Sequence, residues 1–244
     1  MRLTITFVRN WQGARGRVYR TARRAARPAA RKLGDGDHAD AAMLEVNAPA
    51  KPEAAIVAAL GRRSVVLVGM MGAGKSSVGR RLAARLGLTF VDADTEIEAA
   101  AGMSIADIFA AHGEAYFRSG EARVIARLLE GGPQVMATGG GAVMNQDTRA
   151  LIRVKGVSVW LDAEYDVLLR RVKRRTDRPM LKTADPADTL RRLLDERKPM
   201  YAQADLTLRS RDAPHETIVN EAIAALAGHL GIGKQSAVRG EIAP

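Results

Sequence analysis

The sequence predicts an α/β fold in which five strands alternate with helices and form a parallel sheet covered by helices on both faces. Two observations lead to this prediction. A glycine-rich loop lies between an apolar strand and a helix within residues 64–86, and the strand–helix alternation continues to residue 230. Ligands of such sheets bind at the carboxyl ends of the strands, so candidate site residues are expected there.

The glycine loop, residues 69–76, has the pattern Gly-x4-Gly-Lys-Ser between a strand at 64–68 and a helix at 77–86 that ends at Gly87. Glycines let successive backbone N–H groups converge on one anion, and the helix N-terminus adds a partial positive charge. Lys75 is placed to reach the β- and γ-phosphates, and Ser76 to ligate Mg²⁺. The predicted nucleotide-binding residues are Gly72, Ala73, Gly74, Lys75, Ser76 and Ser77.

The other elements follow from hydrophobic periodicity and from capping and breaking residues. Further strands are predicted at residues 89–92, 134–138, 156–161 and 204–208. Further helices are predicted after the capping box of Ser104 and Asp107, and at residues 54–61, 114–129, about 164–175, 186–201 and 215–230.

An acidic segment, Asp92-Ala93-Asp94, closes the second strand. Alternate residues of an extended segment point the same way, so both carboxylates are expected to face the site. Asp92 could serve Mg²⁺ through a water molecule, and Asp94 could accept a hydrogen bond from a substrate hydroxyl and orient or deprotonate it. The alternative interpretation is a solvated acidic turn.

Three later features are candidates for binding the second substrate. Arg118 and Glu121 lie three residues apart on one helix face, so Glu121 can fix the guanidinium for a ligand. Gly139-Gly140-Gly141 follows a strand and removes side chains where a backbone must approach a ligand. Arg197, taken alone, is typical of a surface charge. Two arginines aimed at one site would suit an acidic substrate.

A basic stretch at residues 170–181 contains Arg171 and Arg178. Such a run is usually a solvated face or a nucleic-acid patch, but it lacks interleaved aromatic residues for base stacking. Its position between two helices favours a lid, about residues 171–185, that closes an arginine onto the phosphates.

The net charge of +11 is concentrated at the N-terminus. Residues 1–34 contain ten Arg and Lys residues and no acidic residue, so the remainder carries only one unit of net charge. We expect residues 1–63 to be a disordered basic extension. It is a polyanion-binding tail, a presequence, or a dispensable segment preceding a true start at Met43; the sequence leaves these open. Residues 233–244 are expected to form a flexible tail.

The composition bears on the compartment of the protein and on the classes of partner it can have. No apolar run approaches the roughly 20 residues of a membrane span, so we expect neither a membrane segment nor export. The chain has no cysteine, which fits a reducing compartment. The nearly neutral charge of the remaining residues argues against nucleic-acid binding by that part of the chain.

Taken together, residues 62–230 resemble the shikimate kinases, P-loop kinases of the nucleoside-monophosphate-kinase structural class. The motifs that carry the resemblance, in the family's order, are the glycine loop 69–76, Asp92-Ala93-Asp94, Phe117 to Glu121, Gly139-Gly140-Gly141, Arg178-Pro179-Met180-Leu181 and Arg197 to Tyr201. Met180 departs mildly from the leucine of the family.

The resemblance implies a three-layer fold with sheet order 2-3-1-4-5, a mobile lid over a domain at residues 64–232, and ATP-dependent phosphorylation of the 3-hydroxyl of shikimate. It also implies a cytoplasmic enzyme, expected to be monomeric. The implied catalytic residues are Lys75, Asp94 and Arg178; Arg171 and Arg178 join the ATP site; Asp94, Arg118, Gly139, Gly140, Gly141 and Arg197 bind shikimate; Ser76 and Asp92 hold Mg²⁺.

Two alternatives stay open at this point. One is a related sugar-acid kinase such as a gluconate kinase, although the histidine that those enzymes carry shortly after the acidic segment is replaced here by Thr95-Glu96-Ile97-Glu98. The other is a nucleotide-binding regulator without catalysis.

Overall fold

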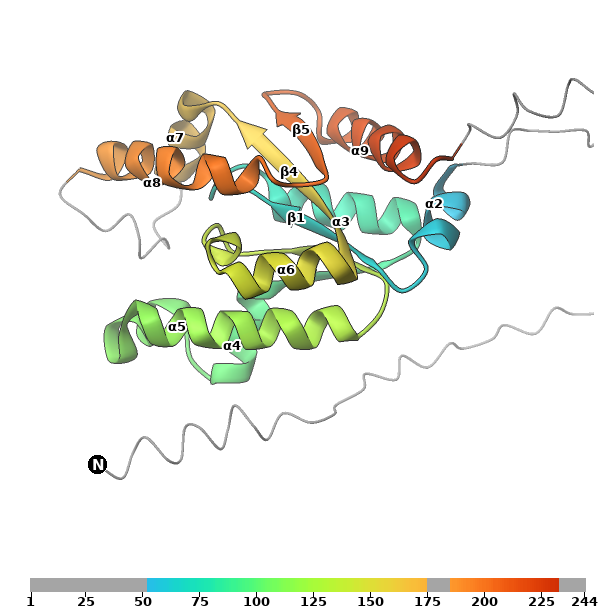
Figure 1. The fold of residues 1–244 in the computed structure, drawn as a ribbon. Helices are drawn as coiled ribbons and strands as arrows, with labels where there is room; N and C mark the ends of the chain where they lie inside the picture. The colour runs from blue at the N-terminus through green and yellow to red at the C-terminus, as the bar shows by residue number, and fades with distance from the viewer. Residues whose placement is uncertain (1–51, 175–184, 233–244) are drawn as a thin grey trace, which may run out of the picture. The chain divides into compact units, whose positions relative to one another are not determined.

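The computed structural model describes residues 52–174 and 185–232 (Figure 1). In chain order the elements are α2 (Pro52–Leu60), β1 (Ser64–Val68), α3 (Lys75–Leu86), β2 (Thr89–Asp92), α4 (Ala93–Ala101), α5 (Ile105–Glu130), β3 (Gln134–Ala137), the short 3₁₀ helix η1 (Ala142–Met144), α6 (Gln146–Lys155), β4 (Gly156–Ala163), α7 (Tyr165–Lys173), α8 (Pro186–Tyr201), β5 (Leu206–Ser210) and α9 (His215–His229). No helix among these residues is long and apolar enough to cross a membrane.

The strands form one parallel sheet in the order β2-β3-β1-β4-β5, which confirms the predicted topology. Strand β1 is central, and its Leu67 pairs with Ala137 of β3. The segments that follow β1 and β3 therefore start side by side at the carboxyl edge of the sheet. These segments are the glycine loop and Gly139-Gly140-Gly141, which we call the glycine segment.

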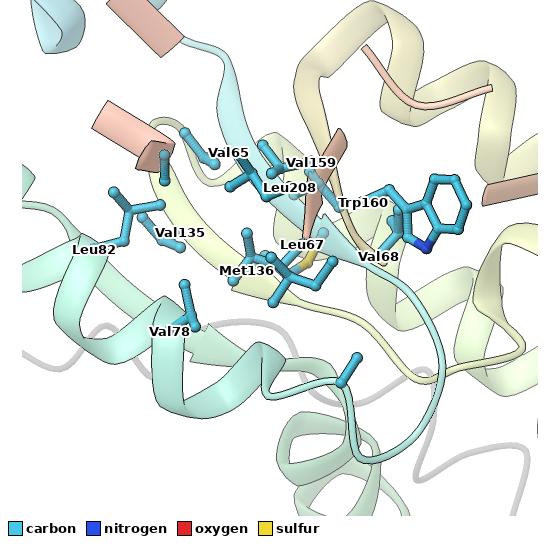
Figure 2. Close-up of a cluster of buried hydrophobic side chains, with 14 of the residues drawn as sticks. Val65, Leu67, Val68, Val78, Leu82, Val135, Met136, Val159, Trp160 and Leu208 are labelled. Carbon is cyan, nitrogen blue, oxygen red and sulfur yellow. The ribbon is translucent and has the colours of Figure 1, made fainter. Parts of the chain in front are cut away.

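Helices cover both faces of the sheet. Helix α3 packs against α9 on one face, and α5 packs against α6 on the other (Figure 1). Every residue of β1 is buried, as expected for a central parallel strand whose two faces are both covered. Figure 2 draws Val78 and Leu82 of α3 in one apolar cluster with residues of β1, β3 and β4.

Helix α3 lies close to the sheet because Gly79 has no side chain. A Cβ at Gly79 would lie 2.5 Å from Cε2 of Phe90 and 2.9 Å from Cδ1 of Leu67. Both distances are too short for any Cβ, so glycine permits the approach of the helix that follows the glycine loop.

The predicted capping box at Ser104 is present, and the two helices predicted after it are separate in geometry. Ser104 accepts a hydrogen bond from the backbone N–H of Asp107. Gly113, with φ of 80° and ψ of 175°, breaks the helical path within α5. One helix therefore precedes Gly113 and the other follows it.

Three details differ from the sequence prediction. The predicted strand at 204–208 lies two residues later as β5, because the Asp205 carboxylate accepts hydrogen bonds from both the backbone N–H and the hydroxyl of Ser158, where a strand partner would otherwise bind. Helices α4 and α6 were not predicted. Each begins with a side-chain cap, from Asp92 and Asn145 respectively.

Helix α2 belongs to the packed unit. It contacts α3 and α9, and its Ile56 and Leu60 are fully buried. The extension predicted for residues 1–63 therefore cannot include residues 52–60. Residues 1–51, the tail at 233–244 and most of the predicted lid, at 175–184, lie outside the described residues.

Candidate active site

The glycine loop has the curled backbone that the sequence predicts. Gly69, Gly72 and Gly74 have φ values of 134°, 82° and 95°, a range in which a residue with a side chain is strained. A Cβ at Gly69 would also lie 2.7 Å from the carbonyl oxygen of Leu161. Buried Ala73 completes the turn, and α3 begins at Lys75, so the helix N-terminus faces the loop.

Lys75 curls back over this loop. Its Nζ donates to the carbonyl oxygens of Gly69 at 2.8 Å and Met70 at 3.0 Å. The ammonium group is thus held at the mouth of the loop, where an anion bound to the backbone N–H groups would meet it. Ser77 is the third residue of α3, in its first turn.

Ser76 and Asp92 form a pair of oxygen ligands beside the loop. The Ser76 hydroxyl donates to Oδ2 of Asp92 at 2.6 Å. Hydroxyl and carboxylate oxygens are the donors that Mg²⁺ prefers. The two predicted metal ligands, sixteen residues apart in sequence, are therefore adjacent in space and of a suitable chemical kind.

The expected strand geometry of Asp92-Ala93-Asp94 is wrong. Asp92 ends β2 and caps α4, and its Oδ1 accepts a hydrogen bond from the backbone N–H of Asp94 at 3.2 Å. Asp94 is therefore in the first turn of a helix, because the capping hydrogen bond starts α4 at once. The Asp94 carboxylate is brought to the site by this turn rather than by strand alternation.

Arg118 is held by two carboxylates of its own helix. Its Nη1 donates to Glu121 at 2.7 Å, and its Nη2 donates to Glu114 at 3.0 Å. Burial acts to lower the pKa of the Arg118 guanidinium, but Glu121 and Glu114 raise it above its ordinary value. Arg118 is therefore a fixed cation whose side chain is still partly exposed.

Glu121 is more deeply buried than the arginine it holds, with only 2% of its surface exposed. Burial raises the pKa of its carboxyl group, Arg118 opposes this effect, and the nearby charge of Asp94 adds to it. Its second oxygen, Oε1, accepts no hydrogen bond from the described residues. The sequence indicated Glu121 only as a support for Arg118.

Charged side chains from other elements lie directly beside the glycine segment. A Cβ at Gly139 would lie 2.6 Å from Oε1 of Glu121 and 2.9 Å from Oδ1 of Asp94. A Cβ at Gly141 would lie 2.5 Å from Nη2 of Arg118. The predicted reason for three glycines was the approach of a ligand; the structure adds that protein side chains already fill the space beside two of them.

Gly140 lies beside Arg197 of α8. A Cβ there would lie 3.4 Å from Nη1 of Arg197 and 3.4 Å from the backbone nitrogen of Met71 in the glycine loop. Arg197 is 5% exposed, so the interpretation of this residue as a surface charge is wrong. Asp94, Arg118, Glu121 and Arg197, which we call the charged cluster, therefore surround the glycine segment beside the glycine loop.

Arg171 lies on the opposite side of the glycine loop. Its Nη1 donates to the carbonyl oxygen of Gly72 at 3.2 Å and to the hydroxyl of Ser210 at 3.1 Å. Ser210, the last residue of β5, in turn donates to the carbonyl oxygen of Ala73 at 2.7 Å. Sequence reasoning did not identify Ser210, since a serine at the end of a strand carries no distinctive signal. Arg178 lies outside the described residues.

Known proteins of one family are similar to most of this chain. The family model described as shikimate kinase matches residues 71–227. The shikimate kinase of Bradyrhizobium diazoefficiens is 65% identical over 188 residues, which cover 77% of this chain and 90% of that protein. The shikimate kinase of Rhodopseudomonas palustris is 67% identical over 178 residues, covering 73% of this chain and 88% of that protein.

Among solved structures, the shikimate kinase from Acinetobacter baumannii in complex with shikimate has a TM-score of 0.67 and 35% sequence identity. The match covers 68% of this chain and 94% of the other.

Proposed function

The chain belongs to the shikimate kinase family, and from this premise we propose that it transfers the terminal phosphoryl group of ATP to the 3-hydroxyl of shikimate. The products are 3-phosphoshikimate and ADP, on the route to chorismate and the aromatic amino acids. The observation that carries the proposal is the position of two arginines and a carboxylate around the glycine segment, against the glycine loop.

The charged cluster suits an acceptor that has both a carboxylate and hydroxyl groups. Arg118 and Arg197 present guanidinium groups that bind the carboxylate of shikimate, and guanidinium is matched to carboxylate in shape as well as charge. The Asp94 carboxylate accepts the hydrogen bond of the 3-hydroxyl. Gly139, Gly140 and Gly141 let the acceptor approach the backbone between these groups.

The nucleotide occupies the glycine loop in this proposal. Backbone N–H groups of residues 72–77 bind the phosphates, and Lys75 exchanges its two carbonyl partners for phosphate oxygens. Arg171 borders the loop from the side of β5, and Arg178 acts on the transferred phosphoryl group. Ser76 and Asp92 hold Mg²⁺, which when bound neutralises charge on the β- and γ-phosphates.

Phosphoryl transfer through a loose transition state needs little covalent help from the protein. Catalysis therefore consists mainly of aligning the 3-hydroxyl oxygen with the γ-phosphorus and stabilising the charge that moves to the leaving oxygen. In this proposal Asp94 orients the hydroxyl or accepts its proton. The proposal includes a monomer and a location in the cytoplasm; a chain without cysteine fits the reducing conditions of that compartment.

An assay of Mg²⁺-dependent ADP release with shikimate, quinate and gluconate as acceptors tests the function. We expect shikimate to be used far better than the other two. Equal or better turnover of gluconate would support the sugar-acid kinase alternative, and ATP binding without turnover of any acceptor would support the regulator.

The acceptor site is tested in the same assay by Arg118→Ala. This change removes one of the two guanidinium groups proposed to bind the acceptor carboxylate, and we expect a loss of about 2 to 5 kcal/mol in acceptor binding with little change in the KM for ATP. Arg127→Ala is the matched control, because Arg127 lies on the same helix and pairs with Glu96 at the surface, at 3.4 Å. A change in ATP affinity with normal acceptor affinity in Arg118→Ala would contradict the proposed role.

A further inference from the structure

The backbone conformation of the glycine segment has to be fixed by contacts with other parts of the protein. Three consecutive glycines have no side chains of their own to anchor them, and glycine has the widest conformational freedom of any residue. The carbonyl oxygens of Gly139 and Gly141 accept hydrogen bonds from Ala142 and Met144, within the same turn of chain. These local bonds leave the peptide group between Gly140 and Gly141 to be held by another part of the molecule.

That peptide group is held by Tyr201, from the end of α8. The Tyr201 hydroxyl donates to the carbonyl oxygen of Gly140, sixty-one residues away in sequence. A peptide group is planar, so fixing the direction of the Gly140 carbonyl also fixes the opposite direction of the Gly141 N–H. One side-chain hydrogen bond thus sets the orientation of the backbone that faces the charged cluster.

The Tyr201 ring is itself firmly placed. Only 1% of the residue is exposed, and its ring stacks with Trp160 of β4 at a centroid distance of 6.0 Å. The hydroxyl oxygen also lies 3.8 Å from Sδ of Met70 in the glycine loop. Arg197 is one helical turn earlier on α8, so it and Tyr201 share a helix face. Tyr201 therefore contacts both the glycine segment and the glycine loop.

We propose that Tyr201 is a positioning residue for the acceptor: its hydroxyl locks the Gly140–Gly141 peptide group in the orientation that receives the acceptor beside the glycine loop. The proposal rests on the proposed function for the identity of the acceptor. The lock itself is a property of the protein without substrate.

The hydroxyl remains a hydrogen-bond donor at the pH of an assay. Burial raises the pKa of Tyr201 to about 12, although Arg197 acts in the opposite direction. The donated bond consequently does not depend on pH in the neutral range.

Tyr201→Phe tests the proposal, because phenylalanine retains the ring that stacks with Trp160 and removes only the hydroxyl. A half-buried carbonyl group without its donor disfavours the native orientation, so we expect the KM for shikimate to rise about tenfold. The KM for ATP is expected to stay within about twofold of wild type, because the contact that is lost on the side of the glycine loop is only the weak one between the hydroxyl and the thioether sulfur of Met70.

Tyr165→Phe is the matched control. The Tyr165 hydroxyl also donates to a backbone carbonyl, that of Ala187, at 2.9 Å. We expect the loss of this bond to change stability but neither KM value. An unchanged KM for shikimate in Tyr201→Phe, or equal rises in both KM values, would overturn the proposal.

A measurement on the free protein tests the lock without an assay. In protein labelled with ¹⁵N-glycine, the amides of Gly140 and Gly141 are expected to show no exchange on the microsecond-to-millisecond timescale by relaxation dispersion in the wild type, and clear exchange in Tyr201→Phe. Exchange in the wild type would overturn the proposal, whether or not the variant folds. If wild-type enzyme failed to phosphorylate shikimate while the dispersion result held, the proposed function alone would be rejected.

Discussion

Glu121 shows how one buried residue affects both binding and stability. Its carboxylate fixes Arg118 at 2.7 Å, and the charge of Arg197 also acts on it. Even so, burial dominates and raises the pKa of this carboxyl group above 4.5. The folded protein therefore binds a proton at Glu121 more readily than the unfolded chain does.

The pH dependence of stability should reveal this effect. Between the ordinary pKa of 4.5 and the raised value, the folded state carries more protons than the unfolded state at this site, so the stability of the wild type falls as pH rises through that interval. Glu121→Gln cannot titrate. We expect the free energy of unfolding of the wild type, measured relative to this variant by urea denaturation, to decrease as the pH rises above 4.5.

The control is Glu130→Gln, the same substitution at the exposed end of α5, where the carboxylate pairs with Lys155. A stability difference between wild type and Glu121→Gln that stays constant across this pH range would show that burial does not govern the carboxyl group.

The sequence predicted the identity of the charged residues better than their surroundings. Arg118 and Glu121 were paired correctly, because three residues along a helix place side chains together regardless of the rest of the fold. The burial of Arg197 could not be predicted, since Arg197 lies against the glycine segment, which is far away in the sequence. The hydrogen bond of Tyr201 to Gly140 is of the same long-range kind.

Among the elements, α3 is the one on which the proposed nucleotide site depends, since its first turn completes the glycine loop. Gly79 lets α3 lie against Phe90 and Leu67. Because position 79 is a glycine, the helix can lie close to the sheet, and this also determines where Lys75 and Ser76 lie.

Gly79→Ala and Gly228→Ala are the same substitution within helices, with opposite expected results. At Gly79 the new methyl group has no room, and we expect a loss of about 1 to 3 kcal/mol in the free energy of unfolding. At Gly228, in α9, no atom lies within 4 Å of the added Cβ, so alanine should stabilise the protein by about 0.5 to 1 kcal/mol. Thermal and urea denaturation of both variants measure the contrast, and a neutral Gly79→Ala would contradict the packing argument.

Elements with strong periodicity were predictable and capped short helices were not. The buried strand at 64–68 coincides with β1. Helix α4 was missed because its cap, Asp92, is also the last residue of a strand, so no separate turn marks the boundary. An isolated acidic pair fits both a strand end and a helix start, and only the hydrogen bond to Asp94 decides between them.

For the molecule as a whole, charge and catalysis occupy different parts of the chain. All but one unit of the net charge lies in residues 1–34, whereas the candidate site residues lie after residue 68. The packed unit that holds the candidate site residues already includes helix α2, because Ile56 and Leu60 are part of its apolar core.

Two truncations test this separation. A variant that starts at Met43 keeps α2, and we expect it to fold and to retain activity while its affinity for DNA falls and loses most of its salt dependence. A variant that starts at Ser64 loses α2 and uncovers α3 and α9, so we expect a lower melting temperature. Steady-state kinetics, DNA retention at several salt concentrations and thermal denaturation provide the readouts. A large loss of activity from the Met43 start would mean that the extension contributes to the catalytic body.

The filled space around the glycine segment restricts how this enzyme can evolve. A side chain gained at Gly139 collides with the carboxylates of Glu121 on α5 and Asp94 on α4, and one gained at Gly141 collides with the guanidinium group of Arg118 on α5. Replacing either glycine therefore requires an earlier or simultaneous change on those helices, such as a shorter residue in place of Arg118. Mutational paths to a different acceptor must then begin on the helices, and the order in which substitutions are tolerated is set by packing.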